Sequence, residues 1–139
     1  MDIEELLEKP YWVIDILPKQ VPAESPGRFF DVERYLLEHP QVDALKARKL
    51  SVMLKLHCYY DLQISTDVCE TWAENPSPEV LRAALDSYLY VLLPGEQALI
   101  TVDPGDINMT LYNASEDLLA LVRQLAAAEG LFVWQPPQE

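Results

Sequence analysis

The feature that most constrains the fold is the stretch Tyr88–Trp134, in which three short apolar runs precede a helical pattern and a fourth apolar run. Turn residues separate the first three runs, with Pro94–Gly95 after the first and Asp103–Asp106, which reads Asp-Pro-Gly-Asp, after the second. At such turns proline presets φ, and glycine is free to adopt a positive φ. Apolar runs joined by short turns that contain glycine are typical of hairpins. The stretch therefore predicts an antiparallel meander of three strands.

The third run, Ile107–Tyr112, alternates in polarity as a strand with one buried face does. The apolar side of this strand consists of Ile107, Met109 and Leu111, and the other side of Asn108, Thr110 and Tyr112.

A helix is predicted over Ser115–Glu129. Asn113 and Ser115 are both suitable N-cap residues, and the sequence leaves the choice between them open. Gly130 is placed for a left-handed C-terminal cap. Apolar residues recur at helical spacing and predict one buried face, formed by Leu118, Leu121, Val122 and Leu125.

The last apolar run, Leu131–Trp134, is apolar on both sides, which predicts a strand covered on both faces. The pattern leaves open whether this strand runs parallel or antiparallel to Ile107–Tyr112. A parallel arrangement in one sheet would require a right-handed crossover through the helix.

The first half of the chain predicts one strand and several helices. The strand is expected at Trp12–Leu17, where Asp15 interrupts an apolar run. A carboxylate at this place marks either an edge strand, which we favour, or a functional position. Residues 61–75 predict a short strand at Leu62–Ile64 or a short helix around Val68–Trp72. Helices are expected over Asp2–Lys9, Arg28–Glu38, Asp43–Tyr60 and Pro78–Asp86, and Phe29, Val32 and Leu36 form an apolar stripe in the second of them.

Together these elements predict an α+β fold: an antiparallel, or mixed, sheet of four to five strands packed against helices. The expected order is α-β-α-α, then a strand or helix, then α-β-β-β-α-β. A length of 139 residues suits one globular domain, and we expect the whole chain, 1–139, to form it.

Acidic residues dominate the second half of the chain. The net charge of the protein is −13, and the segment 56–139 contains 13 acids and 2 bases, Arg82 and Arg123. Phosphates would be repelled by such a chain, so we expect no nucleic-acid binding. A basic protein is the partner that the charge favours.

Two cysteines, an acidic N-terminus without a signal-peptide pattern, and no apolar run of about eighteen residues predict a bacterial-type cytoplasmic protein that does not enter a membrane. The only group that resembles a metal site is His57, Cys58, Asp61 and Cys69, which lacks paired zinc-ligand spacing. We interpret it as a packed histidine and two small buried thiols, and we expect no metal.

Catalytic motifs are missing from the sequence. The four glycines are isolated, so neither a dinucleotide-binding nor a phosphate-binding loop is present. Cys58 is a weak candidate nucleophile, with His39 or His57 as its base. We expect no cofactor and assign no catalytic residue.

The function that the sequence favours is a non-enzymatic protein-binding module, such as an inhibitor or immunity-type protein. The alternatives are a small enzyme that uses carboxylates or Cys58, and a self-assembling structural subunit. Aromatic residues also offer a candidate surface, formed by Tyr59, Tyr60, Trp72, Tyr88, Tyr90 and Tyr112. Candidate partner-binding residues are the carboxylates Asp103, Asp106, Glu116 and Asp117 and the bases Arg48 and Lys55.

Overall fold

The computed structural model describes residues 2–22, 26–38 and 41–136. Its centre is a seven-stranded sheet of order β3-β2-β4-β5-β6-β1-β7, and every strand pairs antiparallel to its neighbours. The α+β class is confirmed, whereas the predicted count of four to five strands is too low. The strands are β1 Tyr11–Asp15, β2 Gln63–Ser65, β3 Ala73–Glu74, β4 Leu89–Leu93, β5 Ala98–Val102, β6 Met109–Tyr112 and β7 Phe132–Trp134.

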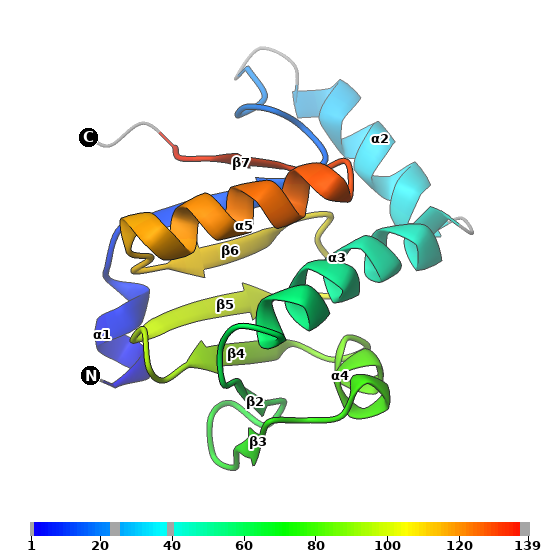
Figure 1. Ribbon diagram of the computed structural model, residues 1–139. Coiled ribbons are helices and arrows are strands. Elements are labelled where there is room, and N and C mark those ends of the chain that lie inside the picture. The colour runs from blue at the N-terminus through cyan, green and yellow to red at the C-terminus, as the bar shows by residue number, and fades with distance from the viewer. Residues whose placement is uncertain (1, 23–25, 39–40, 137–139) are drawn as a thin grey trace.

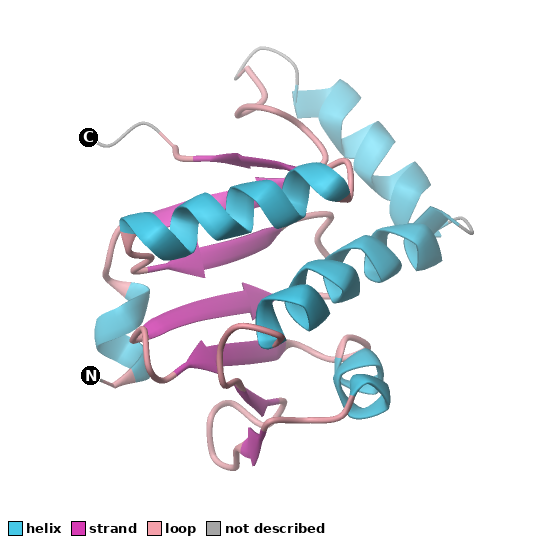
Figure 2. Cartoon of the chain, viewed as in Figure 1, coloured by secondary structure: helices cyan, strands magenta, loops and turns pink. Residues whose placement is uncertain are grey.

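Helices α3, α4 and α5 cover one face of this sheet (Figures 1 and 2). Their buried side chains form one core with alternate residues of the strands, for example Met53, Leu81 and Val122 with Val91 and Ile100. We call this side of the sheet the helix face. The helices are α1 Ile3–Leu7, α2 Pro26–Glu38, α3 Gln41–His57, α4 Pro78–Ala84 and α5 Glu116–Ala128.

The predicted meander is present as β4, β5 and β6. Val91 pairs with Ile100, and Ile100 with Leu111, so these three apolar side chains line up on the helix face. Short turns join the strands, and in the second turn the N–H of Asp106 donates to the Asp103 carbonyl oxygen at 3.0 Å. Among the described glycines only Gly130 has a positive φ, so Gly105 does not use the freedom expected of it.

Local capping explains where α5 begins and ends. The Ser115 hydroxyl accepts a hydrogen bond from the N–H of Leu118, so Ser115 is the N-cap. At the other end Gly130 has a φ of 73°, and the N–H of Leu131 donates to the Ala126 carbonyl oxygen at 2.8 Å. This is the predicted left-handed cap in its Schellman form.

The position of β1 contradicts the prediction that Asp15 marks an edge strand. β1 pairs with β6 on one side and with β7 on the other, so it is an interior strand. Because β1 runs antiparallel to both, β6 and β7 are parallel to each other, with β1 between them. The chain therefore makes a β-α-β crossover through α5 that encloses a strand from the distant N-terminal segment.

The last strand, β7, lies at the edge of the sheet, and the exposure of Phe132 shows that the prediction of a strand covered on both faces is wrong. Phe132 is 47% exposed, and Val133 and Trp134 are half-buried. Arg123 Nη1 donates to the Val133 carbonyl oxygen at 2.8 Å, which occupies one backbone acceptor of β7. Two residues of this run are nevertheless covered: Val133 packs against the core on the helix face, and Leu131 is buried at the end of α5.

Helix α2 packs against α3 and stands apart from the main core (Figure 1). Phe30, Val32 and Tyr35 are each more than half exposed, so the apolar stripe to which Val32 belongs is only partly covered. Phe29 and Leu36 are half-buried. In the described part of the chain, no helix is long and apolar enough to cross a membrane.

Candidate binding surface

The side of the sheet opposite the helix face, which we call the second face, carries the candidate site. Because neighbouring residues of a strand point to opposite faces, the strand registers assign each side chain to one side. Helix α1 contacts β5 and covers one end of this face. The second face presents Tyr11, Val13, Asp15, Tyr90, Leu92, Leu99, Thr101, Thr110, Tyr112, Phe132 and Trp134.

Two pairs of tyrosine rings lie on the second face, and we call Tyr11, Tyr88, Tyr90 and Tyr112 the tyrosine cluster. The ring centroids of Tyr11 and Tyr112 are 5.6 Å apart, and those of Tyr88 and Tyr90 are 5.2 Å apart. Tyr11 is 40% exposed and Tyr88 45% exposed, while the other two are half-buried. The cluster thus combines packed rings with solvent-exposed ring area.

The two pairs of rings are close enough to affect the pKa of each other's hydroxyl groups. Burial raises the pKa of Tyr112, and the neighbouring hydroxyls of Tyr88 and Tyr11 raise it further, against a hydrogen bond with Thr101 that lowers it. Burial likewise raises the pKa of Tyr90, followed by Tyr88, the Cys69 thiol and Tyr112. Burial of the two inner phenols, Tyr90 and Tyr112, thus favours their neutral form.

A hollow of about 480 Å³ lies beside the tyrosine cluster, between α1 and the loop that joins β2 to β3. We call it the acidic hollow, because carboxylates are the only charged groups in its lining. It is lined by Asp2, Ile3, Glu4, Leu7, Val68, Cys69 and Tyr90.

The β2–β3 loop that walls the acidic hollow is held by a network centred on Asp67. The Asp67 carboxylate accepts hydrogen bonds from the Thr71 hydroxyl and backbone N–H and from the Ser65 hydroxyl. These bonds lower the pKa of Asp67 to about 2, with the Thr71 hydroxyl as the largest cause. Val68 and Cys69 both adopt positive φ. Residues 61–75 therefore form a short hairpin with an ordered loop, and the predicted helix around Val68–Trp72 is absent.

A second group of ionisable residues lies at the end of the sheet near α2 and α3. Lys49 is 6% exposed, and its Nζ donates to the Asp106 carbonyl oxygen at 2.8 Å. Burial lowers the pKa of Lys49 to about 8, against the Asp106 and Asp103 carboxylates, which raise it. Partial burial and the Asp103 charge raise the pKa of the Asp106 side chain. Asp103 and Asp106 thus surround a buried ammonium of the chain itself.

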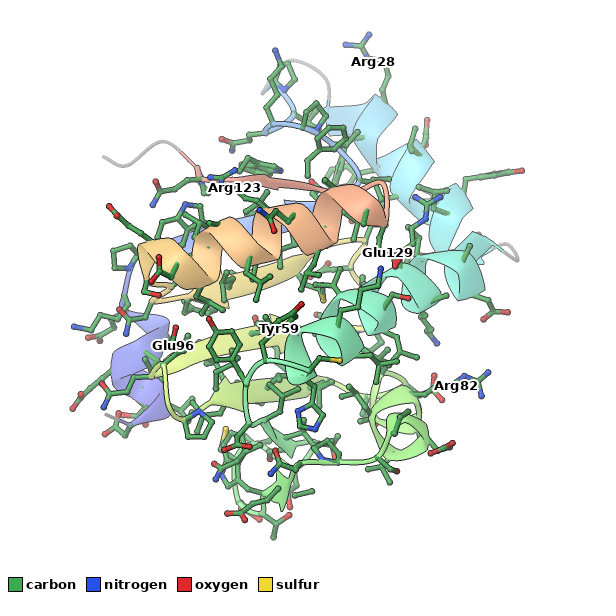
Figure 3. All side chains as sticks on the ribbon, in the orientation of Figure 1. Arg28, Tyr59, Arg82, Glu96, Arg123 and Glu129 are labelled. Carbon is green, nitrogen blue, oxygen red and sulfur yellow. The ribbon has the colours of Figure 1, made fainter. Side chains whose placement is uncertain are left out.

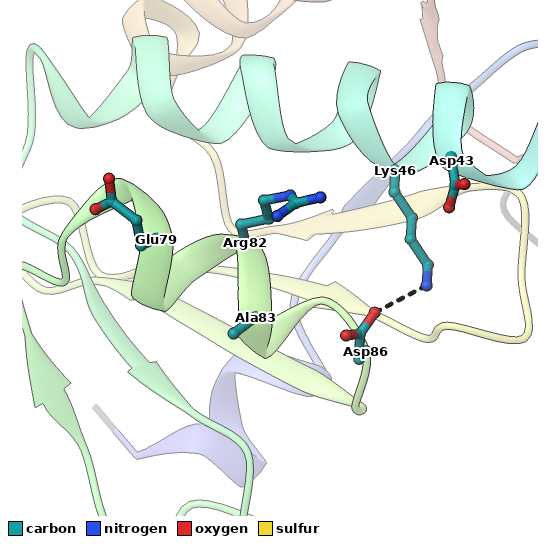
Figure 4. A pocket seen from close by; sticks show the side chains of 6 residues that line it. All are labelled: Asp43, Lys46, Glu79, Arg82, Ala83 and Asp86. Carbon is teal, nitrogen blue, oxygen red and sulfur yellow. Dashed lines mark hydrogen bonds and ion pairs between the residues drawn. The ribbon is translucent and has the colours of Figure 1, made fainter.

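On the helix side, a charged cleft of about 380 Å³ lies between α3 and α4 (Figure 4). Lys46 Nζ lies 2.9 Å from Asp86 Oδ1 across it, and this pair lowers the pKa of Asp86. Arg82 extends along the cleft (Figure 4) and lies at the periphery of the molecule (Figure 3). Both charge signs are present, so the cleft does not single out one class of ligand.

The structure separates the predicted partner-binding residues. Asp103 and Asp106 precede β6, whereas Glu116 and Asp117 follow it at the start of α5, so the two carboxylate pairs lie at opposite ends of that strand. Lys55 Nζ contacts Glu129 Oε1 at 3.0 Å. Arg48 is exposed, and its Nη1 would lie 3.9 Å from a Cβ placed on Gly130.

The fold also does not bring together the residues that the sequence offered as metal ligands or as a thiol active site. His57 Nδ1 lies 3.0 Å from the Tyr60 carbonyl oxygen, and Cys58 Sγ lies 3.5 Å from the Leu54 carbonyl oxygen. Both cysteines are free, and Cys58 is exposed rather than buried as predicted. No set of three or more His, Cys, Asp and Glu residues that could hold a metal ion occurs in residues 2–22, 26–38 and 41–136. His39 lies outside the described residues.

Three of the six aromatic residues that the sequence singled out, Tyr88, Tyr90 and Tyr112, belong to the tyrosine cluster. Tyr11 was missed, and the signal was present, because Tyr11 and Val13 lie two apart in a strand and face the same side. Comparison of the chain with protein-family models, curated proteins and solved structures finds no match in any of the three.

Proposed function

We propose that this protein is a non-enzymatic protein-binding module that holds a basic partner on the second face of its sheet. The observation that carries the proposal is the tyrosine cluster, in which Tyr11 and Tyr88 remain 40% and 45% exposed. Tyrosine is enriched at protein interfaces because it offers a large, rigid contact area with a hydrogen-bonding end at low cost in side-chain entropy.

The charge around the cluster supports a basic partner. The acidic hollow, with Asp2 and Glu4 in its lining, opens directly beside Tyr90. The whole chain has a net charge of −13. Complementary charge raises the rate of encounter and disfavours acidic partners. A partner surface that combines apolar groups with lysine or arginine fits both features.

The sheet edges are poorer docking sites than this face. At β7 the Arg123 side chain already occupies the Val133 carbonyl oxygen, and at the other edge β3 has two residues. Short strands and covered backbone groups are the devices by which proteins prevent strand addition. We therefore propose contact through side chains of the second face.

The test compares partner capture by the wild-type chain with capture by a Tyr11→Ala/Tyr88→Ala variant. We expect the variant to capture less of a basic protein and to bind it at least about tenfold more weakly. Truncation of an aromatic anchor in an interface often weakens binding by about 2 kcal/mol or more. Tyr59→Ala is the matched control, since Tyr59 is 68% exposed and lies beside α3, on the helix side (Figure 3).

Three outcomes would contradict the proposal. One is the absence of any basic partner in native lysate at low salt, and another is equal capture by the wild type and the double variant. The third is a wild-type protein that self-associates in light scattering and becomes monomeric in the double variant, because the face would then bind a second copy of this chain.

A further inference from the structure

A cavity of about 310 Å³ opens at the corner of the second face where β1 and β7 meet the start of α2. Its walls are mainly apolar, with a few polar groups, which is the usual make-up of a small-molecule pocket. The volume lies at the small end of the range of such pockets. It is lined by Asp15, Gln20, Val21, Pro22, Phe29, Phe30, Asn108 and Trp134.

The carboxylate of Asp15 is the charged group of this lining. Asp15 is 4% exposed, although a buried carboxylate is costly unless it is paired. One carboxylate oxygen accepts a hydrogen bond from the N–H of Ile16 at 2.7 Å. Burial raises the pKa of Asp15, while the N–H groups of Leu17 and Ile16 lower it.

The indole of Trp134 is the second unusual group in the lining. Its Nε1–H is buried and makes no hydrogen bond of ordinary geometry, yet it is close enough to Asp15 to lower the pKa of that carboxyl. A carboxylate offers about four acceptor sites, and the N–H groups of Ile16, Leu17 and Trp134 account for three of them, so Asp15 can still accept a hydrogen bond from a ligand. Asp15 thus places an acceptor, with the Trp134 indole beside it, in a mainly apolar pocket.

The surroundings leave an excess of negative charge at this corner. Asp15 is also coupled to Lys49, but the charge of Lys49 is shared with Asp106 and Asp103. The pKa of Glu33 on α2 is raised by burial and then by the Asp106 and Asp15 charges. Several carboxylates therefore face one buried ammonium, and an added cation would be stabilised.

We propose that this pocket binds a small organic ammonium ion with an apolar body. The ammonium contacts the Asp15 carboxylate, and the body lies among Phe29, Phe30 and Trp134. The two phenylalanine rings are 5.8 Å apart and tilted by 60°, and Phe30 is 56% exposed at the mouth. Aromatic faces add cation–π attraction for an ammonium group. This site is independent of the proposed partner-binding function.

The test is an NMR titration of the full-length chain with phenethylammonium chloride, with phenylethanol and sodium phenylacetate as the neutral and anionic analogues. The observed signal is the Trp134 indole N–H resonance, assigned by its loss in Trp134→Phe. We expect the ammonium to shift this resonance and to bind at least about tenfold more tightly than either analogue, which corresponds to about 1.4 kcal/mol.

Two variants and one control make the result decisive. Asp15→Asn keeps an oxygen that can accept the Ile16 N–H bond, and it should weaken ammonium binding at least about tenfold, a loss typical of a missing charged partner. Phe30→Ser removes an aromatic side chain that lines the pocket and is 56% exposed, so it should weaken binding with little effect on the fold. Glu79→Gln, in the first turn of α4, should leave binding unchanged.

A second titration uses lysine whose α-amino and carboxyl groups are both blocked. It tests whether the ammonium ion belongs to a protein side chain or to a free amine. Tighter binding of this probe than of phenethylammonium assigns the pocket to a lysine side chain of a protein, and weaker binding assigns it to a free amine. The proposal is overturned if phenethylammonium leaves the Trp134 resonance unmoved, or if Asp15→Asn binds it as tightly as the wild type does. Binding that persists in Tyr11→Ala/Tyr88→Ala shows that this pocket and the tyrosine cluster are separate sites.

Discussion

Lys49 shows how one buried charge links the stability of this fold to pH. The side chain is 6% exposed and satisfied by the Asp106 carbonyl oxygen, yet burial lowers its pKa from 10.5 to about 8. The folded chain therefore releases the Lys49 proton at a lower pH than the unfolded chain does. Between these two pKa values the unfolded state binds more protons, so the stability contributed by this group rises with pH.

We expect the free energy of unfolding to gain about 2 kcal/mol from Lys49 between about pH 7 and pH 9.5, from 1.36 kcal/mol per pKa unit. The measurement is urea unfolding at several pH values for the wild type and for Lys49→Met. The difference between the two curves isolates this group, because other titrations are common to both. A difference that stays flat across this window would contradict the assignment.

Asp15 and Tyr11 lie in the same strand, and the strands on either side of it determine which groups surround each of them. Asp15 is buried because β7 pairs with β1 on the side that the sequence leaves unspecified. Tyr11 reaches Tyr112 because β6 pairs on the other side. The burial and contacts of a single residue of this chain therefore depend on which strands become its neighbours.

At the scale of elements, the C-terminal end of α5 offers a place to measure how much a local cap contributes to the stability of the fold. Gly130 has a φ of 73°, and a Cβ placed there would meet only Arg48 Nη1, at an ordinary contact distance of 3.9 Å. Any cost of a side chain at this position is therefore a backbone cost rather than a clash.

We expect Gly130→Ala to lower the free energy of unfolding by about 1–2 kcal/mol, the cost of left-handed backbone for a residue with a Cβ. Gly95→Ala is the matched control, because Gly95 has no positive φ and a Cβ there would meet nothing within 4 Å. Chemical unfolding of the two variants decides the point. Equal stabilities would show that the cap contributes little to the fold.

On the scale of the whole molecule, the net charge of −13 dominates the response to salt. The described residues contain two ion pairs, Lys46–Asp86 and Lys55–Glu129. Such exposed pairs stabilise by about 0–1 kcal/mol each, and salt weakens them. Repulsion among the excess carboxylates acts in the opposite direction, and salt weakens it as well.

We expect the repulsion to outweigh the pairs, so the Tm should rise as NaCl increases from about 20 to about 200 mM, where the Debye length falls below about 10 Å. Calorimetry over this range is the measurement. Near pH 5, close to the pI of 4.4, the rise should become much smaller. A Tm that falls with salt at neutral pH would mean that the ion pairs outweigh the repulsion.

The sequence by itself determined the elements that depend on neighbouring residues. The β4–β6 meander follows from alternation and short turns, the start of α4 from Ser77 and the C-terminal end of α5 from Gly130, whereas the choice of Ser115 over Asn113 as N-cap was left to the structure. The sequence also indicated three members of the tyrosine cluster. These features are readable because capping, turn geometry and strand alternation act over a few residues.

Only the tertiary structure decided where β1 and β7 lie and what their side chains meet. The sequence suggested an edge position for Asp15 and a covered position for Leu131–Trp134, whereas β1 is an interior strand and Phe132 in β7 is 47% exposed. Pairing of strands distant in sequence depends on the packing of all the layers together, and apolar runs look alike at an edge and in an interior. The tyrosine cluster and the Asp15 pocket exist because that non-local pairing brings β1 between β6 and β7.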